Sequence, residues 1–212
     1  MALDHLIFQS GDLGGNTGLF WCTRTREALL VDPAGEPEEI LDLLLDRGLA
    51  LRAIALTHAH PDNLLAAPVL AEQTTCDLWL HREDFPLWEG LPELCREFGW
   101  PVPEFGEPHE WLVPGAPLAV GREHLEVVHL PGHSPGSVGF VARELELALV
   151  GDTLFREGRA RADLVLGDET ALEASLDLLA QWPSSWRVVP GHGPAWSPSE
   201  VPRLRQRRSA LL

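Results

Sequence analysis

The residues best suited to chemistry stand together in one short segment, Thr-His-Ala-His-Pro-Asp-Asn at positions 57–63. The segment follows an apolar run at 53–56 that is typical of a buried strand. In an extended chain, residues two apart point to the same side, so the imidazoles of His58 and His60 can reach one metal ion. Asp62 follows on the turn into the next helix, and it adds a carboxylate to a set of ligand types that suits zinc.

Three later segments repeat this design, because each is an apolar strand that ends at a glycine beside a candidate ligand. The candidate ligands are His133, Asp152 and His192. Small residues next to a ligand allow tight turns and close approach of the backbone. A single histidine beside a glycine is usually an ordinary surface or hydrogen-bonded residue. Four strand ends that each carry His or Asp instead favour one shared metal site at an edge of the fold.

The elements that must position these ligands alternate between strand-like and helix-like segments. Residues 37–47, for example, place leucine and isoleucine at helical spacing behind a short apolar strand. Apolar strands followed by helices in both halves predict sheets inside and helices outside. Residues 83–110 are rich in Pro and Trp, and we expect a short helix and loops there that could line a pocket. We expect one α/β domain over residues 1–212.

Composition narrows the partners and the compartment. The chain has 212 residues, of which 45% are hydrophobic, enough for a sizeable core. The formal net charge of −16 repels phosphate backbones and anionic lipids, so we expect neither a nucleic-acid nor a membrane partner. The N-terminus lacks the basic start and apolar stretch of a secretory signal, so we expect a cytoplasmic protein that acts on a small molecule. The sequence leaves the oligomeric state open.

Four motifs in a fixed order carry a family resemblance: THAHPDN at 57–63, PGHSPGS at 131–137, GDTLF at 151–155 and PGHG at 190–193. With them the chain resembles the metallo-β-lactamase superfamily, and within it the glyoxalase II-like (hydroxyacylglutathione hydrolase-like) branch. The similarity runs over nearly the whole chain, from Asn16 to Gly193. The resemblance implies an α/β fold that is a four-layer αββα sandwich of the metallo-β-lactamase type.

The same resemblance implies a role for each candidate ligand. The first metal of the family is held by three histidines, which here are His58, His60 and His133. Asp152 corresponds to the carboxylate that bridges two metals, and Asp62 and His192 correspond to ligands of the second metal. Asp32 resembles a position close behind the ligands, although a turn cap before Pro33 explains it equally well. Zinc is the expected metal, with iron or manganese as alternatives.

One position departs from the family pattern. A histidine normally follows the Asp of the first motif and belongs to the second metal, but here the residue is Asn63. An amide oxygen is a poorer ligand than imidazole for a borderline metal such as zinc. Loss of even an outer partner of a ligand lowers affinity by about 10–100-fold, and loss of a ligand should weaken it at least as much. We therefore expect one tightly bound metal and a weak second site, with Asn63 as a weak ligand.

The implied function is that of a metal-dependent hydrolase that cleaves a thioester with hydroxide, because a bound metal lowers the pKa of its water toward about 7. The catalytic carboxylates would be Asp62, which accepts or orients the water's proton, and Asp152. Arg161 falls where glutathione-binding relatives carry a basic residue, so it is a candidate contact for a substrate carboxylate, with a solvated surface Arg as the alternative. The chain has no Tyr, although those relatives use one there, so a glutathione thioester is only one of the candidate substrates.

Two other functions stay open. Persulfide dioxygenase relatives use a single iron, and His58, His133 and Asp152 would supply the two-His-one-carboxylate set of non-haem iron oxygenases. A mononuclear site, which Asn63 favours, suits this alternative. The third candidate is a metal-stabilised binding protein without catalysis.

Overall fold

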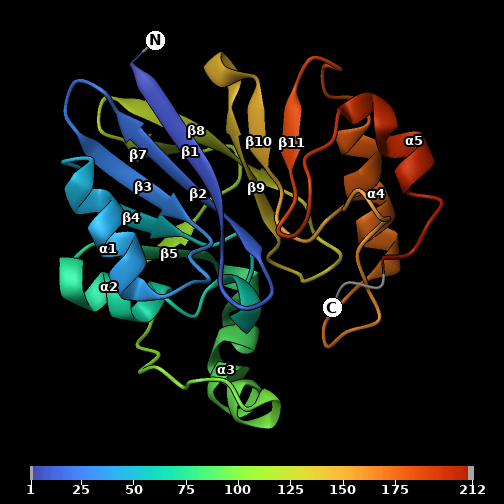
Figure 1. Cartoon of the computed structure of the whole chain (residues 1–212). Coiled ribbons are helices and arrows are strands. Elements are labelled where there is room, and N and C mark those ends of the chain that lie inside the picture. The colour runs from blue at the N-terminus through green and yellow to red at the C-terminus, as the bar shows by residue number, and fades with distance from the viewer. Residues whose placement is uncertain (1, 210–212) are drawn as a thin grey trace.

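The computed structural model describes residues 2–209, which fold into two face-to-face β-sheets with helices on both outer sides (Figure 1). Three hydrophobic clusters fill the spaces between these layers. One lies between the first sheet and its helices, one between the two sheets, and one between the second sheet and its helices. Three cores separate four layers, which confirms the αββα sandwich predicted from the sequence.

The two sheets differ in strand order. In the first sheet, chain order and spatial order agree: β1 (Leu3–Ser10), β2 (Gly15–Cys22), β3 (Glu27–Val31), β4 (Ala50–Ala55), β5 (Asp77–His81) and β6 (Glu110–Leu112). The second sheet runs β11 (Arg187–Val189), β10 (Leu147–Leu149), β9 (Val138–Ala142), β8 (Glu123–His129) and β7 (Pro117–Val120). The first sheet is covered by α1 (Pro37–Asp46), α2 (Ala67–Thr74) and α3 (Phe85–Phe98). The second sheet is covered by α4 (Glu169–Leu179) and α5 (Val201–Leu204).

The strands that precede the candidate ligands all end at one edge of the sandwich. In the first sheet β4 runs parallel to β3 and β5, and in the second β10 runs parallel to β11. Strand β8 pairs antiparallel with β9, and β9 with β10, so β8 points the same way as β10. Backbone hydrogen bonds join the sheets at this edge, from Val138 N–H to the Thr57 carbonyl at 2.8 Å and from Asn16 N–H to the Gly191 carbonyl at 2.7 Å. The loops after β4, β8, β10 and β11 therefore meet.

The segment after β5 contains a helix followed by a loop, as expected from the sequence, but the helix α3 is longer than expected, because it runs continuously for 14 residues. Its buried residues Trp88, Leu91 and Cys95 are spaced as on one helical face. Pro92 lies inside this helix, where a proline costs roughly 3 kcal/mol. Burial of a large apolar side chain contributes about 1.5–3 kcal/mol, so this face offsets the cost of the proline.

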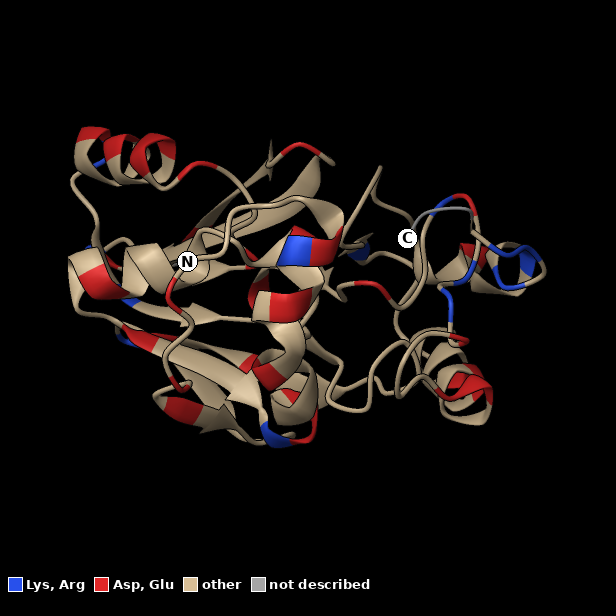
Figure 2. Ribbon diagram, turned by 90° about the horizontal axis from the view of Figure 1, so that it is seen from below, with Lys and Arg blue, Asp and Glu red and all other residues tan. Residues whose placement is uncertain are grey.

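The chain contains 32 Asp and Glu residues but only 16 Arg residues, and the excess of acidic side chains is visible over the molecule. Acidic residues are spread over helices and loops across much of the molecule, and several of the Arg residues lie near the C-terminus (Figure 2). Between residues 2 and 209, no helix combines the length and the apolar character that a bilayer span requires.

Candidate metal centre

The loops that meet at the sheet edge carry all six residues expected to bind metal. They are His58 and His60 after β4, Asp62 in the short helix η1 (Pro61–Asn63), His133 after β8, Asp152 after β10 and His192 after β11. Their potential ligand atoms form two groups, and within each group all of these atoms lie within 4.8 Å of one another. We call the first group, His58, His60 and His133, the histidine triad. We call the second group, Asp62, Asp152 and His192, the mixed triad.

In the histidine triad, three imidazoles meet edge to face. The ring centroids of His60 and His133 are 4.6 Å apart, and those of His58 and His133 are 5.0 Å apart. Nδ1 of His60 lies 2.8 Å from Nε2 of His133. Nε2 of His58 is buried and has no hydrogen-bond partner in the described part of the chain. Three ring nitrogens therefore converge at a place where protein groups leave at least one of them unsatisfied, as a metal site requires.

A hydrogen-bond relay behind the triad sets the tautomer of His58. The backbone N–H of Thr57 donates to Oδ1 of Asp32 at 2.7 Å, and the Thr57 hydroxyl donates to Oδ2 at 2.7 Å. The single hydroxyl proton is thereby used, so Thr57 Oγ1 accepts from His58 Nδ1, 3.0 Å away. With its proton on Nδ1, His58 presents a lone pair on Nε2. Asp32 thus lies directly behind the ligands, as the family resemblance implied.

Backbone carbonyls orient two further imidazoles in the same way. Nδ1 of His133 donates to the carbonyl of Arg161 at 2.8 Å, and Nδ1 of His192 lies 3.3 Å from the carbonyl of Leu13. Such outer hydrogen bonds fix the ring and leave Nε2 free for a metal. The side chain of Arg161 is 45% exposed and pairs with Asp163 at 3.0 Å. Its contact with a substrate carboxylate stays a prediction, whereas the contact of its carbonyl with His133 was not foreseen from the sequence.

The mixed triad lies directly beside the histidine triad. Oδ2 of Asp62 is 3.0 Å from Nε2 of His192. Oδ2 of Asp152 is 3.8 Å from Nε2 of His133, so this carboxylate reaches both groups. Its other oxygen, Oδ1, is buried without a hydrogen-bond partner among residues 2–209. Asp152 therefore occupies the position from which a carboxylate can bridge two metals.

The electrostatics of the site suit a cation. Burial lowers the pKa of His58 and of His60, and it lowers the pKa of His133 to about 3, so all three imidazoles are neutral and can donate lone pairs. Burial and the negative charge of Asp62 raise the pKa of Asp152. A bound divalent ion relieves this penalty, because it pairs with the carboxylate that burial destabilises.

Glycines allow the two sheets' loops to approach this closely. A Cβ on Gly191 would lie 2.0 Å from Oδ1 of Asp152, and a Cβ on Gly151 would lie 2.4 Å from Oγ1 of Thr57. Only glycine fits in these two places, which explains the Gly before Asp152 and the Gly before His192 in the sequence motifs.

Asn63, where the family pattern has a histidine, is buried at the mixed triad. Its Oδ1 has no hydrogen-bond partner in the described residues, and its Nδ2 donates to Oδ2 of Asp62 at 3.3 Å. A Cβ on Gly191 would lie 3.3 Å from Asn63 Oδ1 and close to Asp152, so the amide oxygen shares this corner of the site. The amide oxygen is thus unpaired at the mixed triad, and its role as a weak metal ligand stays a prediction.

Asp84 is a residue of the site that sequence reasoning missed. It is the last residue of the 3-10 turn η2 (Arg82–Asp84) after β5, is fully buried, and accepts three hydrogen bonds from the two loops of the histidine triad. Oδ2 accepts from Ala59 N–H at 2.9 Å and from the Ser134 hydroxyl at 2.7 Å, and Oδ1 accepts from Gly136 N–H at 2.5 Å. One carboxylate thus joins the loop after β4 to the loop after β8. Its signal in the sequence was its place after a strand parallel to β4.

A third group of possible ligands lies outside the two triads. The rings of His81 and His129 stack at 4.7 Å, and Glu83 lies 3.7 Å from His129 Nε2. That nitrogen is already paired with the carbonyl of Pro135 at 2.9 Å, and Glu83 is exposed. This group therefore lacks the buried, unsatisfied ligand atoms of the metal centre.

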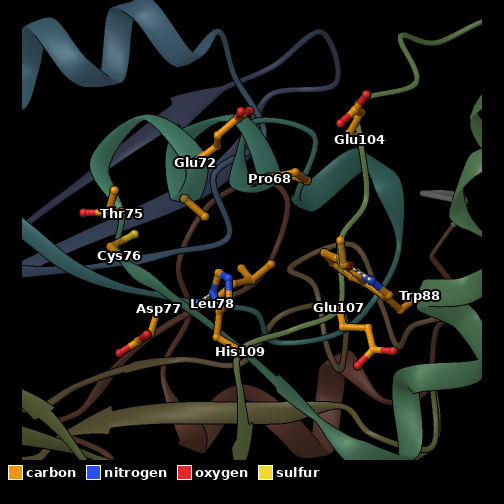
Figure 3. A pocket seen from close by; sticks show the side chains of 12 residues that line it. Pro68, Glu72, Thr75, Cys76, Asp77, Leu78, Trp88, Glu104, Glu107 and His109 are labelled. Atoms are coloured by element: carbon orange, nitrogen blue, oxygen red, sulfur yellow. Dashed lines mark hydrogen bonds between the residues drawn. The ribbon is translucent and has the colours of Figure 1, made fainter.

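Two clefts of similar size are lined by α2 and by the segment that follows α3. One, of about 470 Å³, includes Asp62 of the mixed triad in its wall. The other, of about 480 Å³, is shown in Figure 3, where Glu72, Trp88 and His109 line it. No residue of either triad lines the second cleft, so the first is the one that adjoins the metal centre.

Comparisons with known proteins agree with this geometry. Residues 10–192 match the family model described as "Metallo-beta-lactamase superfamily". "Hydroxyacylglutathione hydrolase GloC" of Haemophilus influenzae is 34% identical over 181 residues, which cover 84% of this chain and 85% of that protein. "Probable metallo-hydrolase YqgX" of Bacillus subtilis is 32% identical over 170 residues, which cover 79% of this chain and 81% of that protein.

Solved structures give the same result. The structure titled "TTHA1623 in a di-iron-bound form" superimposes with a TM-score of 0.85 at 38% identity, covering 94% of this chain and 98% of that one. The "BLEG-1 B3 metallo-beta-lactamase" superimposes with a TM-score of 0.84 at 29% identity, covering 93% of this chain and 95% of that one. A family model that spans most of the chain, relatives above 30% identity and a convergent set of His and Asp ligands lead to one assignment: the chain belongs to the metallo-beta-lactamase superfamily, and a hydroxyacylglutathione hydrolase is among its relatives.

Proposed function

We propose that this protein is a metal-dependent hydrolase that cleaves thioesters. The observation that carries the proposal is the pair of buried atoms without hydrogen-bond partners, His58 Nε2 and Asp152 Oδ1, within two adjoining groups of ligand atoms. A relative named as a hydroxyacylglutathione hydrolase supports thioesters as the substrate class. A divalent metal held by these residues activates water and polarises a carbonyl as a Lewis acid.

The chain's own residues position the reactants. Asp62 Oδ2 accepts hydrogen bonds from His192 and Asn63, so its carboxylate is held where it can orient a water molecule and take its proton. The hydrogen bonds to Asp62 and the nearby carboxylates outweigh burial and raise the pKa of His192 to about 9, which keeps it paired with Asp62 until a metal replaces the proton. A departing thiolate is a good leaving group, so the reaction needs no further strong acid from the protein.

We propose zinc for the histidine triad and weak binding at the mixed triad, where Asn63 replaces an imidazole. Iron and manganese are the alternatives, and a relative crystallised in a di-iron-bound form gives iron specific support. The second candidate function, an iron-dependent persulfide dioxygenase, rests on the same observation and on the set His58, His133 and Asp152. We place the protein in the cytoplasm, because Cys22, Cys76 and Cys95 are all free thiols, as is usual in reducing compartments.

The decisive experiment combines elemental analysis of the purified protein with two assays, thioester hydrolysis and oxygen uptake on glutathione persulfide. We expect about one tightly held zinc per chain, thioester cleavage that a chelator abolishes, and no oxygen uptake. Iron with oxygen uptake would replace the hydrolase by the dioxygenase. Metal binding without turnover of any tested ester, thioester, lactam or phosphodiester would leave a non-catalytic binding protein.

A further inference from the structure

The cleft of about 470 Å³ beside Asp62 has walls of a distinct chemistry. Its apolar wall comes from the turn between β1 and β2, from the start of α2, and from the segment after α3. The side chains that form it are Leu13, Leu65, Val69, Trp100 and Val102. Leu13 and Val102 are 46% and 42% exposed and line the same cleft, so they form part of a continuous apolar wall. An exposed apolar wall beside a reactive centre is typical of a ligand site.

The charged residues of this cleft are all acidic. Asp12, Glu36 and Glu39 line it in addition to Asp62, and all three are exposed to solvent. Among the described residues that line the cleft there is no Arg and no His, and the chain contains no Lys. A substrate carboxylate in this cleft would meet three like charges and no counter-ion. Like charges repel, and low-dielectric walls strengthen that repulsion.

We propose that this cleft is the binding site for an uncharged, apolar acyl group of the substrate, and that it selects against anionic acyl groups. The inference rests on the proposed hydrolase function, and it adds the class of thioester: an aliphatic or aromatic acyl chain without a carboxylate. Asp62 joins the cleft to the mixed triad, so an acyl chain that lies in the cleft places its carbonyl carbon next to the metal centre. Arg161, the candidate contact for a substrate carboxylate, touches the histidine triad through its carbonyl and does not line this cleft.

The anchoring of Trp100 supports a preformed wall. Its backbone N–H donates to the Cys95 carbonyl at 2.8 Å, and its ring stacks on Phe98 with centroids 5.1 Å apart. Three residues of the following segment, Pro101, Val102 and Pro103, continue the lining. A proline-rich segment that is pinned at its start loses little conformational freedom when a ligand binds.

The test uses two thioesters of N-acetylcysteamine that differ only at the end of the acyl chain. Hexanoyl ends in a methyl group, and adipoyl has a carboxylate in its place. We expect the metal-loaded protein to prefer hexanoyl over adipoyl by at least about tenfold in kcat/KM, which corresponds to roughly 1.4 kcal/mol. Shortening the uncharged chain should lower kcat/KM by about threefold to fourfold for each methylene that the cleft buries.

A charge-neutral variant and a matched control locate the selectivity. Glu36→Gln/Glu39→Gln should raise kcat/KM for the adipoyl thioester severalfold more than kcat/KM for the hexanoyl thioester. The control, Glu72→Gln/Asp77→Asn, removes the same charge from the cleft of Figure 3 and should leave the ratio unchanged. Trp100→Ala should lower kcat/KM for hexanoyl more than for acetyl. An equal effect of the two double variants would show that overall charge sets the ratio, and would overturn the proposal.

Uncleavable ketones, in which a CH₂ replaces the ester sulfur, separate this inference from the proposed function. Calorimetry with the metal-loaded protein should show tighter binding of the hexanoyl analogue than of the adipoyl analogue. Such discrimination without turnover of either thioester would count against a hydrolase and in favour of the cleft. Equal binding of the two analogues, or tighter binding of the anion, would overturn the inference even if both thioesters were cleaved.

Discussion

The histidine triad and the mixed triad lie side by side, yet hydrogen bonds hold them in different ways. Behind the histidine triad, buried groups fix the loops from several sides: Asp32 through Thr57, Asp84 through three hydrogen bonds, and the carbonyl of Arg161. In the mixed triad, by contrast, Asp62 bonds mainly to His192 and to Asn63, which belong to the same site.

The outer partners of the two triads also differ in burial. Asp32 and Asp84, which support the histidine triad, are at most 2% exposed. Each triad also has one imidazole that is oriented by the carbonyl of an exposed residue, Arg161 for His133 and Leu13 for His192, so the difference lies in the two buried carboxylates. Buried hydrogen bonds hold a geometry more firmly than exposed ones. The histidine triad is therefore preorganised for a metal, whereas the geometry of the mixed triad depends on bound ions and on contacts among its own residues. Four predictions test this contrast.

The largest effect should come from removing a ligand of the preorganised triad. We expect His133→Ala to lose the tightly held metal and to lower kcat/KM for a thioester by at least about 100-fold, because loss of a ligand exceeds loss of an outer partner. His192→Ala should retain one metal per chain and lower kcat/KM less. Elemental analysis after dialysis and a thioester assay measure both variants. Equal metal loss in the two would remove the distinction between the triads.

The next effect concerns Asp84 as a positioning residue. In Asp84→Asn one carboxylate oxygen is replaced by an NH₂ group. This group must face N–H or O–H donors whose hydrogen bonds the carboxylate accepts in the unsubstituted protein. An unsatisfied buried donor costs about 1–3 kcal/mol. We expect the metal of the histidine triad to dissociate about 10–100-fold faster in a chelator competition assay.

A control separates positioning from simple stability. Glu83→Gln changes the exposed neighbour and should leave metal dissociation unchanged. The melting temperature of the metal-free Asp84→Asn protein measures how far the substitution weakens the fold itself. If the melting temperature fell while the rate of metal dissociation stayed unchanged, Asp84 would stabilise the fold without positioning the ligands.

A smaller effect, in the opposite direction, should follow from restoring the family residue at position 63. Asn63→His adds an imidazole next to Asp62 and Asp152, and we expect affinity for a second metal to rise by about tenfold or more. Affinity for the first metal should stay the same, because the histidine triad has its own support from Asp32 and Asp84. Metal titration of the stripped proteins distinguishes the two sites. Two tightly held ions in the unsubstituted protein would contradict the expectation.

The sequence predicted the fold and the convergence of the ligands for a clear physical reason. Apolar strands end in Gly next to His or Asp, and parallel strand ends must share an edge, so His58, His133 and Asp152 could be brought together before any coordinates. The same reasoning predicted a helix in residues 83–110 but not its length, because α3 continues through Pro92, where burial of Trp88 stabilises it. Periodicity reports the average face of a segment and cannot weigh a proline against a tryptophan.

Outer contacts were harder to predict because they depend on details of packing. The residue type of Asp84 gave no hint that its carboxylate joins two loops that are 75 residues apart in sequence, from Ala59 to Ser134. For Arg161 the expected contribution was a guanidinium, whereas the observed contact comes from a carbonyl that every residue type carries. Sequence motifs identify ligands by side-chain chemistry, but they do not reveal support that comes from the backbone.

The smallest effect should come from Arg161→Ala, and it tests whether support by a carbonyl is independent of the side chain. The variant keeps the carbonyl that accepts from His133, so metal dissociation should stay within about twofold of the unsubstituted protein. The Arg161 side chain is exposed, and an exposed ion pair with a substrate carboxylate contributes about 0–1 kcal/mol, so loss of this contact should raise KM for a glutathione thioester by at most about fivefold. The matched control is Arg156→Ala, because the Arg156 side chain is 46% exposed and also forms an ion pair. Rapid metal loss from Arg161→Ala alone would mean that the surface ion pair sets the carbonyl, and the histidine triad would then depend on an exposed loop as much as the mixed triad does.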